Sequence, residues 1–128
     1  MQRDYPKSIK EHHELVRGLR CVVTDRPRVS LHHVQGSSVG RRLAEMGYDP
    51  LKSLNQRGSG SEALVIPLAP ELHFAGADAI DGQMGRTTWE TRFGKQSDFV
   101  DEVSAQVGYD LWKLFVLWSS VKHVKIVV

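Results

Sequence analysis

Two adjacent histidines at the end of an apolar, partly β-branched run constrain this chain more than any other feature. His32 and His33 lie within residues 29–34, which read VSLHHV. Such a run predicts a strand, and consecutive side chains on a strand point to opposite faces. One imidazole can therefore bind a metal ion while its neighbour faces a substrate. His73, which follows the apolar run Val65-Ile66-Pro67-Leu68, is a third imidazole that can reach the same metal site.

The composition is that of a globular domain without covalent cross-links. With 128 residues, 41% of them hydrophobic, the chain is long enough for one domain spanning residues 1–128. No apolar run approaches the length needed to cross a bilayer, and the polar start argues against a secretory signal. Cys21 is the single cysteine, which excludes an intrachain disulfide and a four-cysteine zinc site. We therefore expect a cytoplasmic protein with no membrane association.

Charge is unevenly distributed along the chain, although the net charge is only +2. Residues 15–60 carry eight Lys or Arg against three Asp or Glu, whereas residues 71–110 carry three against eight. This polarity favours a surface that meets a polyanion. The alternative is a solvated dipole with no partner.

Local signals predict an α+β fold. Ser8 and Glu11 form a capping box that predicts a helix from Ile9 to Arg17, ended by Gly18. We expect residues 19–23 to form a strand that pairs as a hairpin with residues 29–34. The segment 35–62 is polar and rich in Gly and Ser, with a short helix near residues 41–46, and residues 63–68 predict a short buried strand.

The second half of the chain predicts helices. Thr87 and Glu90 match a capping box for a helix that carries Trp89 and ends at Gly94. Asp98 is expected to cap a further helix that ends at Gly108, and residues 111–118 form either a last core helix or a homodimer contact. The tail, residues 121–128, resembles a strand without an obvious partner.

The histidines and nearby carboxylates suggest a metal site. His32, His73 and Asp81 are the expected ligands, with Asp78 as a weaker alternative for the carboxylate. Gly82 would let the backbone bend so that Asp81 turns back toward the imidazoles. Two imidazoles and one carboxylate with open positions suit a catalytic divalent ion better than a closed structural site. His33 would then serve as the general base that deprotonates water.

Adjacent histidines also occur without function. The chain has a second pair, His12-His13, on the expected first helix, where we expect solvated side chains.

Three stretches together resemble phage-encoded HNH-type nucleases of the Ref-like, recombination-enhancement group. They are the run that carries the histidine pair, the segment Val65-Ile66-Pro67-Leu68-Ala69-Pro70-Glu71-Leu72-His73, and the segment Gly85-Arg86-Thr87-Thr88-Trp89-Glu90-Thr91-Arg92-Phe93-Gly94-Lys95-Gln96. The resemblance implies a small ββα-metal core over about residues 19–95, with flanking N- and C-terminal helices, the latter an extension over about 97–118. It also implies one divalent metal, Mg²⁺ or Mn²⁺ with Zn²⁺ also possible, DNA strand cleavage in a phage or prophage setting, and a possible recombinase filament as partner.

The same resemblance assigns roles to residues. His33 matches the general base, His32 and His73 match metal ligands, and Asp81 falls where relatives place a histidine or an aspartate before glycine. Many HNH-type proteins also carry cysteine pairs that hold a structural zinc. Because Cys21 is alone, no structural zinc is expected here. Asn55, the only asparagine, is a poor match for the central Asn of HNH, and a backbone carbonyl could orient His33 instead.

Arginines are the expected contacts to DNA. Arg41 and Arg42 follow the small residues 36–40, which would let a phosphate backbone approach, and Arg28 and Arg57 complete the set. No base-reading helix is evident, so binding is expected to be largely independent of sequence. The alternative is a loop with ordinary solvated arginines.

Two other functions stay open at this point. One is a non-catalytic module with a degenerate HNH fold that binds nucleic acid or protein. The other is a zinc-dependent hydrolase of a small substrate, for which a deep apolar pocket beside His73 would be evidence.

Overall fold

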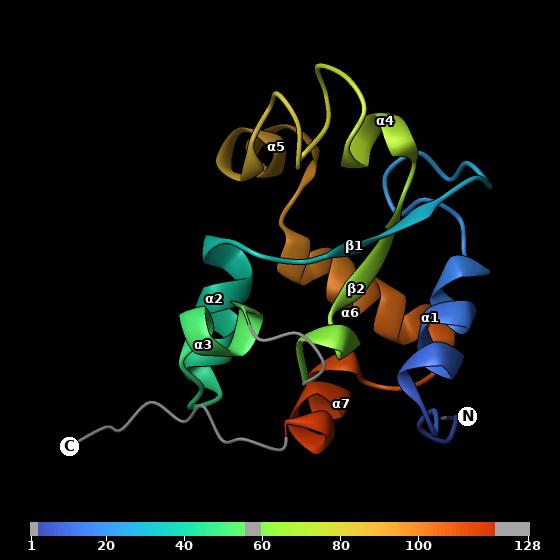
Figure 1. Ribbon diagram of the computed structural model, residues 1–128, viewed down its shortest axis with the longest axis vertical. Helices are drawn as coiled ribbons and strands as arrows, with labels where there is room; N and C mark the ends of the chain where they lie inside the picture. The colour runs from blue at the N-terminus through green and yellow to red at the C-terminus, as the bar shows by residue number, and fades with distance from the viewer. Residues whose placement is uncertain (1–2, 56–59, 120–128) are drawn as a thin grey trace.

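The computed structural model describes residues 3–55 and 60–119 and has a mixed α+β architecture (Figure 1). Helices surround a small sheet in which two strands cross the middle of the molecule. In chain order the elements are α1 (Ile9–Arg17), β1 (Ser30–His33), α2 (Ser37–Glu45), α3 (Pro50–Asn55), the 3₁₀ helix η1 (Gly60–Ala63), β2 (Val65–Leu68), α4 (Pro70–His73), α5 (Arg86–Phe93), α6 (Gln96–Val107) and α7 (Leu111–Trp118).

The sheet joins two segments that are far apart in the sequence. β1 and β2 are antiparallel, with Ser30 opposite Leu68 and His33 opposite Val65. The expected hairpin between residues 19–23 and 29–34 is wrong. Residues 19–23 form no strand, because the chain closes into a turn in which the Cys21 carbonyl accepts a hydrogen bond from Asp25 N at 2.9 Å. Their link to the sheet is a hydrogen bond from Val22 N to the Pro67 carbonyl, at 3.1 Å.

β2 is the centre of the hydrophobic core. All four of its residues are buried, and α1 and α6 pack against it. On α6, Val100 and Val103 are fully buried, in line with the helical spacing seen in the sequence. Trp89 of α5 joins the same cluster. Burial of these side chains stabilises the folded state by about 25 cal/mol for each Å² of apolar surface removed from water.

The expected helices are present, but three of their starting points are wrong. α2, expected near residues 41–46, begins at Ser37. α1 matches the prediction, and Ser8 Oγ accepts a hydrogen bond from Glu11 N at 3.1 Å. α5 begins at Arg86, so Thr87 lies inside the helix and does not cap it. α6 begins at Gln96, two residues before Asp98. The Glu90 carboxylate accepts the Gln96 backbone N–H at 2.7 Å, so a side chain from the preceding helix satisfies one of the N–H groups left unpaired at the start of α6.

The expectation that His12 and His13 are solvated is also wrong. His12 is fully buried, and its Nε2 lies 2.9 Å from the Ala63 carbonyl oxygen. Its Nδ1 accepts a hydrogen bond from the Tyr109 hydroxyl at 2.7 Å. Burial lowers the pKa of His12 to about 4 and raises that of Tyr109 to about 12. Both groups are therefore neutral at pH 7, and they fix α1 to η1 and to the segment between α6 and α7 from within the core.

η1 and α7 approach each other closely at Gly60. A Cβ at this position would lie 2.8 Å from Phe115 Cδ2 and closer still to the Phe115 carbonyl and to Ser119 Oγ. Gly60 is therefore required by the packing of η1 on α7. In the described ranges, none of the helices combines the length and the apolar character that crossing a bilayer requires. The tail at residues 121–128 lies outside the described residues.

Replacing Tyr109 by Phe should destabilise the fold. The change leaves the buried Nδ1 of His12 without its donor, which costs about 1–3 kcal/mol. Urea unfolding followed by tryptophan fluorescence at pH 7.5 measures the loss. A stability within about 0.5 kcal/mol of the wild type would contradict the assignment of this hydrogen bond.

Candidate metal centre

The two histidines of β1 belong to different clusters on opposite sides of the strand. His32 lies with His73 and Asp81, whereas His33 lies with His13 and Glu62. In each cluster, one ligand atom from each residue lies within 4.8 Å of the others. The alternation expected of a strand is therefore what separates the two imidazoles.

The first cluster contains the three ligands expected from the sequence. Asp81 Oδ2 lies 3.2 Å from His32 Nδ1 and 3.1 Å from His73 Nε2. The two imidazole rings meet edge to face, with centroids 5.0 Å apart. The arrangement could hold a metal ion.

Backbone hydrogen bonds bring Asp81 back to the end of α4. Asp81 N donates to the His73 carbonyl and Ile80 N donates to the Leu72 carbonyl, each at 2.9 Å. The residue that turns the chain is Gly76, whose φ of 111° favours glycine. Gly82 serves a different purpose from the one expected, since its φ is not positive. A Cβ there would lie 3.0 Å from the Cβ of Ala79, so glycine supplies space.

Asp78 is not part of the cluster. Its Oδ1 pairs with Arg92 Nη1 at 3.0 Å, and the carboxylate is nearly half exposed. Of the two aspartates considered as ligands, Asp81 alone reaches both imidazoles.

Gln96 determines which nitrogen of His32 carries the proton. The Gln96 amide oxygen accepts from the Gln35 backbone N–H at 3.2 Å, and its amide nitrogen donates to the Gln35 carbonyl. The oxygen is therefore the atom that faces His32 Nε2, at 2.8 Å, so Nε2 must be the donor. In the neutral ring, Nδ1 then presents its lone pair to Asp81.

His73 has a similar arrangement. Ser30 Oγ donates to the Leu68 carbonyl at 3.4 Å and lies 2.6 Å from His73 Nδ1, from which it accepts. Nε2 of the neutral ring then faces Asp81 with its lone pair. Hydrogen bonds from the outer nitrogen of each ligand histidine are typical of protein metal sites.

Asp81 is a carboxylate at neutral pH. Burial acts to raise its pKa, but hydrogen bonds from His32 and His73 outweigh burial, and the pKa lies well below its usual range. Because the outer nitrogen of each ring already donates a hydrogen bond, the nitrogen that faces Asp81 can donate one only if the imidazole carries both protons and is charged. With neutral rings, two nitrogen lone pairs and a carboxylate oxygen converge, and a cation satisfies all three. The donor set therefore fits a divalent metal.

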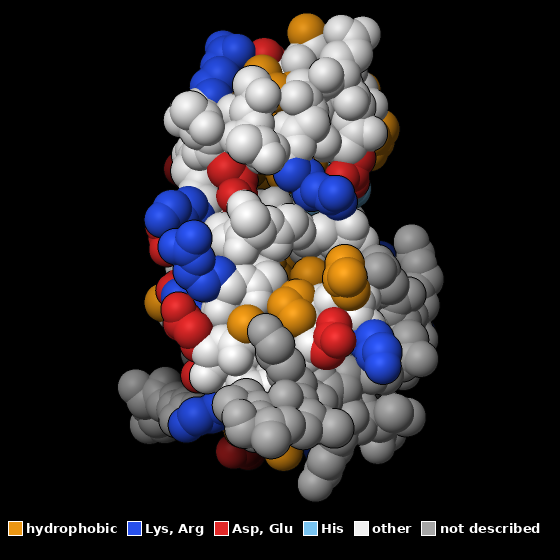
Figure 2. All heavy atoms as spheres, turned by 90° about the vertical axis from the view of Figure 1, so that its left-hand side faces the viewer, with side chains coloured by type: hydrophobic (Ala, Val, Ile, Leu, Met, Phe, Trp, Pro, Cys, Tyr) orange, Lys and Arg blue, Asp and Glu red, His pale blue; other side chains and the backbone are white. Residues whose placement is uncertain are grey.

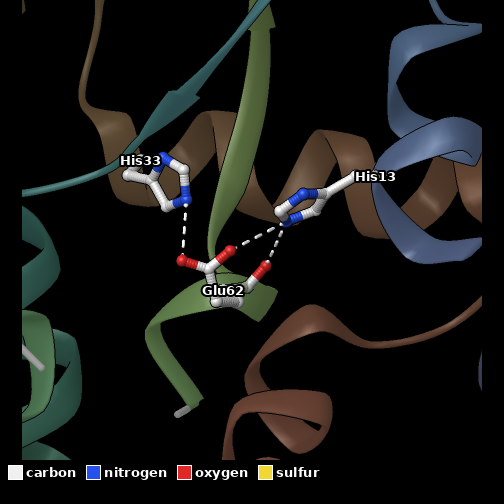
Figure 3. Close-up of side chains that lie close together, drawn as sticks. All are labelled: His13, His33 and Glu62. Atoms are coloured by element: carbon white, nitrogen blue, oxygen red, sulfur yellow. Dashed lines mark hydrogen bonds and ion pairs between the residues drawn. The ribbon is translucent and has the colours of Figure 1, made fainter. Parts of the chain in front are cut away.

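The second cluster was not expected from the sequence (Figure 3). His33 Nε2 lies 3.2 Å from Glu62 Oε1, so a carboxylate is placed to orient the ring. From α1, His13 Nε2 donates to the Glu62 backbone carbonyl at 2.9 Å. Glu62 side chain is only 14% exposed, which makes these contacts electrostatically strong. No sequence motif marks His13 or Glu62, and only the packing of α1 and η1 against β1 brings them together.

The arginines expected to bind DNA differ in their surroundings. Arg28 and Arg41 are exposed. Arg42 donates two hydrogen bonds to Asp101, at 3.1 and 2.9 Å, and its guanidinium lies 4.8 Å from the Trp112 ring centroid. Arg42 therefore holds α2 against α6 and α7. Arg57 lies outside the described residues.

Basic and acidic segments are interleaved in space. Arg42–Asp101 and Arg26–Glu71 join the basic part of the sequence to the acidic part. Figure 2 shows Lys and Arg side chains next to Asp and Glu on the face over α2, α3 and α5. On this face the charge polarity of the sequence gives no continuous basic surface.

Comparison with known proteins gives no relative. No family model matches the chain, and no curated protein or solved structure is significantly similar to it.

Asp81→Ala should remove the response of the protein to metal at the first cluster. Saturating Mn²⁺ raises the stability of a protein that binds it by about 2.7 kcal/mol at 100 times the dissociation constant. Because the variant keeps only the two imidazoles, we expect its affinity to fall by about 100-fold or more. Thermal unfolding with and without Mn²⁺ measures the change.

Asp78→Ala is the matched control. It removes a carboxylate from the same loop, together with the ion pair to Arg92, but leaves the cluster intact. An Mn²⁺ response in Asp81→Ala equal to that of Asp78→Ala would show that the metal binds elsewhere.

Proposed function

We propose that this protein is a divalent-metal-dependent DNA endonuclease of the HNH type. The observation that carries the proposal is the separation of neighbouring imidazoles on β1. His32 contributes to a cluster of two histidines and a carboxylate, while His33 faces a second carboxylate on the other side. This division between metal ligand and base is the one that a one-metal phosphodiesterase requires.

The order of elements is compatible with a ββα-metal core. Two antiparallel strands are followed directly by α4, which supplies His73, and α1 and α7 flank this core. We assign β1, β2 and α4 to the ββα unit. In this assignment, α2, α3 and η1 form an insertion between the two strands.

The chain's own residues divide the chemistry as follows. His32, His73 and Asp81 would hold Mg²⁺ or Mn²⁺, and Zn²⁺ also suits these donors. When bound, the cation supplies positive charge next to a phosphate and stabilises the charge that develops during cleavage. Gln96 and Ser30 keep the two imidazoles in the tautomers that ligation requires.

His33 is the general base. With its Nε2–H donated to Glu62, the proton-accepting nitrogen is Nδ1. Glu62 holds the ring in this tautomer and stabilises the imidazolium that forms when the ring takes a proton from water. Glu62 is thus a positioning residue, and His33 is a catalytic residue.

DNA is the proposed substrate on the basis of the resemblance and of the arginines. The exposed side chains of Arg28 and Arg41 are available to phosphates, whereas Arg42 would first have to leave Asp101. We place the protein in the bacterial cytoplasm during phage growth, with a recombinase filament as a possible partner. A homodimer through α7 is a further possibility, since Leu117 on this helix is 63% exposed.

His33→Ala should abolish strand cleavage without loss of the metal site. Removing a general base lowers the rate by about 10²–10⁴-fold. Conversion of supercoiled to nicked plasmid in Mg²⁺ or Mn²⁺ measures the rate, with EDTA as the metal-free condition and Asp78→Ala as the matched control.

Nicking by a folded His33→Ala protein at the wild-type rate would refute the role of His33. DNA binding that persists in EDTA, with no cleavage by the wild type in any divalent metal, would instead favour a non-catalytic binding module.

Glu62→Gln should reduce kcat by about 10-fold or more and leave KM nearly unchanged, because the substitution affects the base and not the substrate contacts. In a His33→Ala background the same substitution should cause no further loss, since the two residues act as a unit. Single-turnover nicking of the two single variants and the double variant tests this coupling. Additive losses would contradict a positioning role.

A further inference from the structure

The cluster of His13, His33 and Glu62 is chemically more than a support for one imidazole. We propose that it is a second metal site, that this site binds Zn²⁺, and that zinc bound there switches off the general base. The inhibitory part rests on the proposed nuclease function, whereas the binding of zinc does not.

The geometry brings three donors from three separate elements to one point. His13 comes from α1, His33 from β1 and Glu62 from η1, and Figure 3 shows both imidazoles directed at the carboxylate. The three ligand atoms lie within 4.8 Å of one another. Zinc ligands lie about 2.0–2.2 Å from the ion, so small side-chain rotations suffice to close the site.

The solvent exposure of the three side chains suits a metal site with one open coordination position. The side chains of His13 and Glu62 are 12% and 14% exposed, so packing holds two of the three ligands in place. The side chain of His33 is 34% exposed, which gives an ion and a water molecule a route to the site. Two imidazoles and one carboxylate are the ligands of known zinc centres with one open position.

Without a metal ion, the two oxygens of the Glu62 carboxylate lie at different distances from the two imidazoles. Glu62 Oε1 lies 3.2 Å from His33 Nε2, within hydrogen-bond distance, but Oε2 lies 3.6 Å from His13 Nε2, which is too far. His13 Nε2 donates to the Glu62 backbone carbonyl instead. Zinc would replace the Nε2 hydrogen bonds of His13 and His33 by coordinate bonds, with the proton of each imidazole moving to Nδ1.

That movement of the proton explains why zinc would inhibit. His33 acts as a base through Nδ1 only while Nε2 carries the proton. An ion on Nε2 requires the proton on Nδ1, so the nitrogen that would deprotonate water becomes a donor. Zinc therefore blocks the base chemically, without displacing His33 from β1.

Zinc stoichiometry tests the site independently of cleavage. Isothermal titration with Zn²⁺ is carried out on the full-length Asp81→Ala protein, in which the first cluster is incomplete, and on Asp81→Ala with His13→Gln. We expect the single variant to bind one equivalent that the double variant binds at least about 100-fold more weakly. Co²⁺ absorption in the visible range reports the coordination of the same site. The control protein combines Asp81→Ala with Glu14→Gln, because Glu14 is an exposed residue of α1 next to His13.

Two results would overturn the site. One is an Asp81→Ala protein that binds no zinc, and the other is equal zinc affinity in the single and double variants while circular dichroism shows both folded. Loss of zinc binding in the Glu14→Gln control would equally refute the assignment to His13.

The inhibition is measured separately, as plasmid nicking in Mg²⁺ against rising Zn²⁺, each variant being compared with its own zinc-free rate. We expect His13→Gln to need at least about 10-fold more zinc than the wild type for half inhibition. Equal zinc sensitivity would refute the switch. If the wild type cuts no DNA, the proposed function fails, but the zinc titration still decides whether the site exists.

Discussion

The antiparallel pairing of β1 with β2 is the constraint on which the rest of the structure depends. Because β2 is buried along its whole length, its partner has only one position in which Leu31 and His32 can pack. A shift by one residue would exchange the environments of His32 and His33. The buried strand thus determines which imidazole meets Asp81 and which meets Glu62.

A buried polar network secures the same strand from the side of α6. The Gln96 side chain contacts the backbone of Gln35 in both directions and receives a hydrogen bond from His32. Glu90 joins the network through the Gln96 backbone and through Ser38. Such a network is costly when one member is unsatisfied, so it specifies a single arrangement of α2, α5, α6 and β1. His32 is therefore held by groups that lie far from it in sequence.

The sequence predicts what short-range patterns determine. α1 was predictable from its capping box, and the grouping of His32, His73 and Asp81 from the strand, the Pro70 helix start and the glycine-rich turn. The sequence does not predict where a tertiary contact overrides or replaces a local sequence signal. Residues 19–23 have strand-forming side chains but close on themselves as a turn, and the Glu90 carboxylate accepts a backbone N–H at the start of α6, which begins before Asp98. His13 and Glu62 lie 49 residues apart, and no periodicity connects them.

The close approach at Gly60 links the position of the Glu62 side chain to the packing of α7. Glu62 follows Gly60 by two residues within η1, and η1 rests directly on Phe115 of α7. A larger residue at position 60 would lift the whole 3₁₀ turn and carry the carboxylate away from His33. If the protein is the proposed nuclease, substitutions in the apolar seam between η1 and α7 would therefore change its cleavage rate through the position of Glu62.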